Sequence, residues 1–302
     1  MKKPRSLALV TGSMLCLIVA AQQIPDSAFT YQSKTPAYPK GQGPVVVLDE
    51  AHFNFHTLGG RYHAFGKVLE NDGYAMRPGT QQFNLRYLEQ ARILVISNAL
   101  SDGSSWQLPT SDAFTEEEIE AVKDWVYNGG SLFLIADHMP FAGAAASLAR
   151  MFGVNWINGY AVRKDRAPEY FARKAGNLTP NPITDGGNAL ERIDGVQSFT
   201  GSAFLVPPEA VPITLMNDDY EILLPTTAGQ FSDSTAYVDG AYFIHGAMLP
   251  FGKGRAVFFG EAAMFTAQLH GPDRRPTGMN QPGSEQNPQL LLNVIHWLDH
   301  RL

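Results

Sequence analysis

The sequence is poor in cysteine: Cys16 is the only one among 302 residues. It lies within residues 1–21, a segment typical of a secretory signal. If this segment is removed, the mature chain keeps no cysteine at all. Disulfides, cysteine-ligated zinc sites and a cysteine nucleophile are then excluded together. A mature protein of this composition must be held together by its core alone.

The N-terminal segment has the three parts of an export signal. Lys2, Lys3 and Arg5 form a positive region, the stretch 7–19 is apolar, and residues 19–21 are small. The apolar stretch is shorter than the about 20 residues that a spanning helix needs, so cleavage after Ala21 is the prediction. An uncleaved anchor is the alternative, and a lipoprotein is disfavoured by the residues before Cys16. We therefore expect a periplasmic or extracellular protein without a stable membrane span after cleavage.

Basic residues are also in short supply. The chain has 23 Lys and Arg against 29 Asp and Glu, a formal net charge of −6. This balance argues against nucleic acid as a partner, because phosphate binding needs a basic surface. A small molecule or a component of the cell envelope is the expected ligand. The hydrophobic share of 44% suffices for a core and excludes wholesale disorder.

Several sequence signatures are missing. The chain contains no Gly-x-Ser-x-Gly elbow, no P-loop and no Gly-x-Gly-x-x-Gly after a strand. The sequence therefore gives no indication of a serine hydrolase with that elbow or of a nucleotide-binding site of these two kinds. The candidate chemistry must come from another arrangement of residues.

Apolar runs and helical periodicity alternate along the first half of the chain. Residues 22–43 are polar and rich in Pro and Gly, which indicates a tether or a wrapping arm. From residue 44 onward, buried strands alternate with amphipathic helices, and Thr115 and Glu118 form a capping box. The predicted strands are 44–48, 91–97 and 131–136, and the predicted helices are 61–71, 115–128 and 142–152. This alternation predicts an α/β fold with a mostly parallel, doubly wound sheet.

The second half of the domain 44–302 departs from this rhythm. Residues 157–235 contain short apolar runs separated by Pro and Gly, which predicts a β-rich insertion covering one end or edge of the sheet. Residues 236–246 and 254–260 are predicted to pair, with 256–259 returning to the central sheet. Asn287 is predicted to cap a final helix that has Pro288 at its first position.

Polar side chains follow three of the predicted strands. Asp49 and Glu50 follow the first, Asp137 and His138 follow another, and Glu261 follows the last. Ligands of doubly wound sheets bind beyond the carboxyl ends of the strands, so these groups are expected at one edge. We assign Asp49, Glu50, Asp137 and Glu261 as candidate catalytic residues.

His52, Asn54 and His56 follow the first strand at alternate positions. An extended backbone would place all three on one side and send Phe53 and Phe55 into the core. His52, His56 and Asp137 are candidate ligands for zinc or another divalent metal, because imidazole and carboxylate suit such ions. The alternative is that Asp49 and His52 cap loops by bonding to backbone amides. Asn54, His138 and His245 are candidate ligand-binding residues, His245 because it stands beside a glycine near a predicted strand end.

The stretch from Phe114 to His138 resembles the core of the class I glutamine amidotransferase-like superfamily. Within it, the stretch is similar to a DUF4350-type branch, and residues 47–52 and 293–298 fit the same resemblance. The resemblance implies a flavodoxin-like three-layer sandwich with its site at the carboxyl edge of the sheet. It also implies that residues 136–140 occupy the turn of the family's nucleophile and that Glu261 lies near the later turn. Because no cysteine stands at that turn, glutaminase activity is not expected.

Two functions remain open from the sequence. The first is an exported ligand-binding or envelope-associated module without glutaminase activity, favoured by the missing nucleophile. The second is a metal-dependent hydrolase with a His/Asp/Glu cluster, favoured by the convergence of ionisable groups, with one carboxylate as general base. Whether the protein is an enzyme is left undecided at this point.

Overall fold

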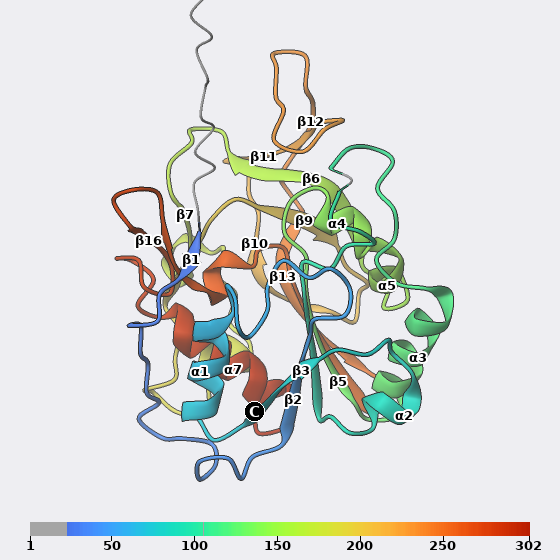
Figure 1. Ribbon diagram of the computed structural model, residues 1–302. Helices are drawn as coiled ribbons and strands as arrows, with labels where there is room; N and C mark the ends of the chain where they lie inside the picture. The colour runs from blue at the N-terminus through green and yellow to red at the C-terminus, as the bar shows by residue number, and fades with distance from the viewer. Residues whose placement is uncertain (1–22, 105) are drawn as a thin grey trace, which may run out of the picture.

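The structure, a computed structural model, describes residues 23–104 and 106–302. The predicted signal segment, residues 1–21, lies outside the described residues. An eleven-stranded sheet crosses the molecule in the order β12-β11-β6-β9-β13-β14-β5-β4-β2-β3, with β10 paired to β13 (Figure 1). The α/β fold predicted from the sequence is confirmed.

Parallel strands form one half of this sheet. They are β2 (Val45–Asp49), β3 (Ala75–Gly79), β4 (Ile93–Ser97), β5 (Ser131–Ile135) and β14 (Gly254–Phe259). Each pairs in parallel with its neighbour in the order β3-β2-β4-β5-β14. The carboxyl ends of these strands therefore meet at one edge of the sheet.

Helices cover both faces of the parallel strands (Figure 1). One face packs against α1 (His63–Asn71) and α7 (Asn287–Leu298), and the other against α3 (Glu116–Tyr127) and α5 (Ala146–Arg150). Alternate residues of β4 face opposite cores, with Val95 in the first and Leu94 in the second. Burying such an aliphatic side chain contributes about 1.5–3 kcal/mol. The continuous apolar run is thus explained by burial on both faces.

Local signals in the sequence set several boundaries. The capping box of Thr115 and Glu118 opens α3, as predicted, and Gly129 follows the helix with φ of 123°. The predicted helix 142–152 is divided into α4 (Phe141–Ala144) and α5. Strand β3 and the short α2 (Leu85–Leu88) were not predicted. Strand β3 is a partly exposed edge strand containing Pro78, so it lacks the apolar run of a central strand.

Antiparallel strands form the other half of the sheet. They are β6 (Asn155–Arg163), β9 (Gly201–Leu205), β10 (Val211–Leu215), β11 (Tyr220–Leu224), β12 (Ala236–Asp239) and β13 (Ile244–Phe251). Strand β7 (Glu169–Ala172) forms a separate two-stranded sheet with β8 (Gly195–Ser198), and η1 (Arg173–Ala175) and α6 (Pro182–Asp185) lie between these two in the sequence. The predicted β-rich region therefore continues the central sheet.

Two boundaries predicted in the last third are wrong. The predicted strand 236–246 is broken between β12 and β13, where Tyr242 has φ of 73°. Asn287 is the first residue of α7 and makes no cap; Gln286 precedes it. The Asn287 side chain instead accepts a hydrogen bond from the Gln197 amide and donates to the Gln197 and Met264 carbonyls.

The segment 23–43 lies along the surface of the domain. Its strand β1 (Ile24–Pro25) pairs with β15 (Ala267–His270), which pairs in turn with β16 (Arg275–Gly278). The hydroxyl of Tyr38 donates a 2.6 Å hydrogen bond to Asp299. Among the described residues, no helix is both long and apolar enough to cross a membrane.

Candidate functional site

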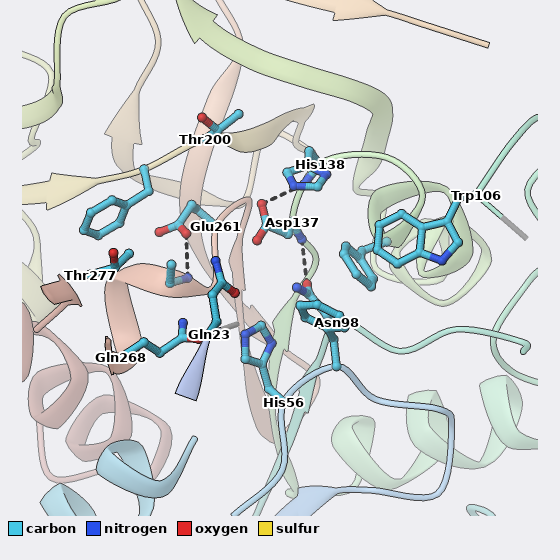
Figure 2. Close-up of a pocket in the computed structure, with 14 residues that line it drawn as sticks. Gln23, His56, Asn98, Trp106, Asp137, His138, Thr200, Glu261, Gln268 and Thr277 are labelled. Atoms are coloured by element: carbon cyan, nitrogen blue, oxygen red, sulfur yellow. Dashed lines mark hydrogen bonds between the residues drawn. The ribbon is translucent and has the colours of Figure 1, made fainter. Parts of the chain in front are cut away.

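A cavity of about 330 Å³ opens at the carboxyl edge of the parallel strands (Figure 2). Asn98 follows β4, Asp137 lies just beyond β5, and Glu261 lies just beyond β14, and these three strands are adjacent. As the carboxyl-end rule predicts, Asp137 and Glu261 lie together at this edge of the sheet. The other lining residues are Gln23, Phe55, His56, Trp106, His138, Phe141, Phe199, Thr200, Ala263, Gln268 and Thr277.

Asp137 is a buried carboxyl group on the wall of the cavity. One oxygen accepts a 2.8 Å hydrogen bond from the amide of His138, and its own amide donates to Asn98 Oδ1 at 2.9 Å. Burial raises the pKa of Asp137, and the neighbouring His138 offsets this only in part. The protonated, neutral form of this acid is therefore favoured more than it would be in water.

Glu261 faces the same cavity and is almost completely buried. Its two oxygens accept hydrogen bonds from the amides of Ala263 at 2.5 Å and Met264 at 2.7 Å, in the turn η2 (Ala263–Phe265). Burial and the charge of Asp137 raise the pKa of Glu261 well above its usual range, despite these two bonds. Two acids thus share one poorly solvated cavity and disfavour each other's ionisation.

Asn98 connects β4 to this site. Its backbone is left-handed, with φ of 50°, a conformation that asparagine tolerates better than most residues. Its side chain is 1% exposed, and Nδ2 completes no hydrogen bond within residues 23–104 and 106–302. Nδ2 lies near enough to Asp137 to lower the pKa of that acid as a hydrogen-bond donor does, but the two groups do not reach the geometry of a full hydrogen bond.

The two histidines of the cavity have different environments. His56 is buried, bonds through Nδ1 to the Ser97 hydroxyl at 3.1 Å, and is neutral because burial lowers its pKa to about 3. His138 is partly exposed and stacks on Tyr160, with 4.2 Å between the ring centroids. Its Nδ1 donates to the Met139 carbonyl at 2.8 Å, which leaves Nε2 as an acceptor when the ring is neutral.

The small β1-β15-β16 sheet forms a polar wall of the cavity. Gln268 lies on β15 and Thr277 on β16, and Gln23 immediately precedes β1 (Figure 2). Gln268 is 2% exposed, and its Oε1 accepts no hydrogen bond in the described part of the chain. The arm at residue 23 is therefore part of the site.

An aromatic wall, formed by Phe55, Trp106 and Phe141, also lines the cavity. The three rings pack against one another, with centroid separations of 5.5 Å for Phe55 and Phe141 and 5.6 Å for Trp106 and Phe141. These apolar rings restrict the water that reaches this part of the cavity. The polar wall and the aromatic wall together give it an amphipathic lining.

His52 belongs to a separate buried network. Its Nδ1 lies 2.9 Å from both oxygens of Asp49, and its Nε2 lies 2.9 Å from Glu118 Oε1. Burial alone would lower the pKa of His52, but the two carboxylates reverse this effect and raise it. Both ring nitrogens face acceptors, so His52 is held here as an imidazolium ion between two carboxylates.

The predicted extended arrangement of residues 52–56 is wrong. Phe53 has φ of 44° and is 63% exposed, so it does not point into the core. The left-handed residue breaks the alternation on which the prediction depended. His52 consequently points to the buried network, while His56 points to the cavity.

The remaining predicted site residues lie in other surroundings. Asn54 donates to Asp49 Oδ2 at 2.9 Å, and Glu50 accepts the amide of Leu58 at 2.7 Å. His245 is buried between the hydroxyls of Ser198 and Thr214, at 3.2 Å each. The cavity thus brings together Asp137, His138, Glu261 and His56, and it does not bring in Asp49, Glu50, His52, Asn54 or His245.

The candidate metal ligands are divided in the same way, because His56 and Asp137 line the cavity and His52 does not. Within the ranges 23–104 and 106–302, no group of three or more His, Cys, Asp or Glu residues is arranged to hold a metal ion. The geometry therefore gives no direct support to the three-residue metal set.

Asn98, Gln268, Thr200 and Trp106 were not singled out from the sequence. Asn98 could have been found, since it directly follows the apolar run 93–97 and the carboxyl-end rule applies to every strand. Gln268 lies on a strand outside the main sheet, and Trp106 lies on a loop. No periodicity in the sequence indicates their positions.

Comparisons with known proteins bear on the fold. No family model matches the sequence, and no curated protein does. The mmIFT52 N-terminal domain matches with a TM-score of 0.59 and 13% identity, over 84% of this chain and 97% of that chain. The chain shares the fold of that domain. A likeness at this identity shows the fold alone.

Weaker matches include two bacterial proteins. Cytoplasmic protein STM3548 from Salmonella typhimurium has a TM-score of 0.49 at 14% identity, covering 84% of this chain and 98% of that one. A ThuA-like protein from Bacteroides uniformis ATCC 8492 has a TM-score of 0.46 at 12% identity, covering 89% and 94%. The topology and the mmIFT52 match agree on an α/β fold with a mixed sheet. The DUF4350-type branch is a finer assignment that these matches do not reach.

Proposed function

We propose that this chain is an exported ligand-binding module, of a DUF4350-type branch and without glutaminase activity, that takes a small, uncharged, polar molecule. The observation that carries the proposal is a pair of unused polar atoms, Asn98 Nδ2 and Gln268 Oε1, on residues that line one cavity. Buried polar groups of native proteins nearly always have partners, and each one left without a partner costs about 1–3 kcal/mol. A ligand with both a donor and an acceptor would satisfy these two atoms.

The charged groups of the cavity lining further restrict the class of ligand. Among its described lining residues there is no lysine or arginine, and its two acids have raised pKa values. An anion would meet repulsion from any ionised carboxylate. Protonated carboxyl groups can donate and accept hydrogen bonds with hydroxyl and amide groups. An uncharged ligand rich in hydroxyl or amide groups fits this lining best.

The aromatic wall supports the same conclusion. Binding sites commonly combine apolar and aromatic surface with a few convergent polar groups that fix orientation. Here Phe55, Trp106 and Phe141 supply the apolar surface, and Asn98 and Gln268 supply polar groups. A compact molecule with one apolar face would contact both walls at once.

Thr200→Trp is expected to abolish ligand binding, because Thr200 lines the cavity and an indole there would occupy it. Glucose, myo-inositol and N-acetylglutaminamide, all uncharged, are suitable probes, measured by thermal shift of the full chain. A ligand at 100 times its Kd stabilises the folded state by about 2.7 kcal/mol. We expect one of these probes to stabilise the native protein and none to stabilise Thr200→Trp.

Thr226→Trp is the matched control, since Thr226 is exposed and lines neither this cavity nor a second cavity that lies beside it. It should retain the thermal shift of the native protein. Equal shifts in the two tryptophan variants would contradict the location of the site. No shift with any of the three probes in the native protein would contradict the proposed ligand class.

A metal-dependent hydrolase is the alternative function, and the pair of acids in the cavity favours it. Asp137 and Glu261 share the cavity without a lysine or arginine among its described lining residues, and a bound cation would relieve their repulsion. If this function holds, chelation with EDTA should lower the Tm, and zinc or manganese should restore it. Asp137→Ala should abolish the restoration, whereas His52→Ala should leave it intact because His52 lies in the other network. A Tm unaffected by chelation favours the binding module.

A further inference from the structure

A second cavity, of about 530 Å³, adjoins the first. The two cavities share His138 and Thr200 as lining residues. The same two side chains therefore border both spaces, and the two cavities are neighbouring compartments at this edge of the sheet.

The second cavity is lined mainly by apolar and aromatic side chains. Val162 on β6 and Leu223 on β11 belong to neighbouring strands of the antiparallel half of the sheet. Tyr160 stacks on His138 on one side and meets Phe231 edge-to-face on the other, with 5.0 Å between those two ring centroids. This surface would accept an aromatic ring or a short alkyl chain, unlike the polar wall of the first cavity.

Arg166 adds a positive charge to this apolar lining. Its guanidinium Nη2 donates a 2.8 Å hydrogen bond to Glu221 Oε1, and the Arg166 side chain is 57% exposed. The guanidinium end of this pair is exposed to solvent, which weakens an ion pair, so an anionic group on a ligand can compete with Glu221 for it. Of the seven described lining residues, Arg166 alone is a lysine or arginine.

We propose that the second cavity binds an aromatic or alkyl group that carries a carboxylate or similar anion, joined to the polar head held in the first cavity. The ligand class is thus an amphiphilic anion with an uncharged polar head. This inference rests on the proposed function, because the head is the ligand assigned there. The tail can nevertheless be tested without the head.

The experiment compares 3-phenylpropionate with 3-phenylpropanol, which share a ring and chain but differ in charge. Binding to the full chain is measured by ligand-observed and protein-observed NMR titration. We expect the acid to bind about two- to fivefold more tightly than the alcohol, as for one exposed ion pair. Arg166→Gln should remove this preference. Glu221→Gln should enlarge it, because the guanidinium then has no competing carboxylate.

A second pair of variants locates the site. Leu223→Glu places a negative charge in the cavity and should abolish binding of 3-phenylpropionate, whereas Leu205→Glu alters an exposed leucine outside it. Circular dichroism checks that both variants remain folded. Equal affinity for acid and alcohol, or no response to Arg166→Gln and Glu221→Gln, would overturn the proposal. If the polar probes bind the first cavity while 3-phenylpropionate does not bind at all, only this further inference fails.

Discussion

Replacing His52 by alanine is expected to lower the free energy of unfolding by about 3–5 kcal/mol, the usual cost of breaking a buried ion pair. The imidazolium lies between Asp49 and Glu118, which are 0% and 4% exposed. Its removal leaves two buried carboxylates without their shared counter-charge. The effect should be among the largest that one substitution outside the apolar core produces.

The loss of stability in His52→Ala depends on pH, and this dependence follows from the shifted pKa values of His52 and Glu118. The pKa of His52 is raised above 6.5, so its contribution is complete below that pH and is lost as pH rises through the raised value. The pKa of Glu118 is lowered because its bonds to Thr115 and His52 outweigh burial. Its contribution is present above 4.5 and is lost as pH falls through the lowered value. The destabilisation by His52→Ala should therefore be greatest between about pH 4.5 and 6.5.

Urea unfolding of both proteins over a range of pH measures this difference. His63→Ala is a suitable control, since His63 is a half-buried histidine at the start of α1, outside the network. It should change the free energy of unfolding by much less. A loss below 1 kcal/mol for His52→Ala would show that the three-residue network contributes little net stability.

The parallel half of the fold could be predicted because its signals are local. Apolar runs such as 93–97 record burial on both faces, and Thr115 with Glu118 bonds within one helical turn. Strand β3 was not predicted because an edge strand needs no continuous apolar run, and its Arg77 and Pro78 are exposed. The strand order of the antiparallel half depends on long-range pairing, which periodicity does not encode.

Only those residues of the candidate site that directly follow a buried strand could be predicted from the sequence. Asp137 and Glu261 follow buried strands, and parallel pairing brings them to one edge. His52 was misplaced because a single left-handed residue, Phe53, reverses the direction of the following side chains. Gln23 and Gln268 reach the cavity through a small sheet that joins β1 to β15 and β16, which lie more than 200 residues later in the sequence. Such a contact between distant segments has no signature in either segment.

Replacing Asp137 by asparagine is expected to stabilise the protein at neutral pH. The pKa of Asp137 is raised in the folded state, so the folded protein loses stability as pH rises from the ordinary value of 3.8 through the raised one. Each unit of such a shift corresponds to about 1.4 kcal/mol. Asparagine cannot ionise, and its Oδ1 can still accept the His138 amide. The variant and the native protein should have similar stability near pH 4 and diverge above it.

Urea unfolding at pH 4 and pH 8 checks this expectation, with the exposed Asp218→Asn as the control that should show no such divergence. Asp137→Asn should also weaken ligand binding, since a protonated carboxyl group, whose hydroxyl can donate and accept hydrogen bonds, is replaced by an amide whose NH2 group can only donate. A variant that is more stable at pH 8 and binds less would show that this acid is retained for the ligand at the expense of the fold, as expected of a functional group. A loss of stability at pH 8 would instead show that the ionised form of Asp137 is favoured in the folded protein, and the uncharged character assigned to the cavity would be wrong.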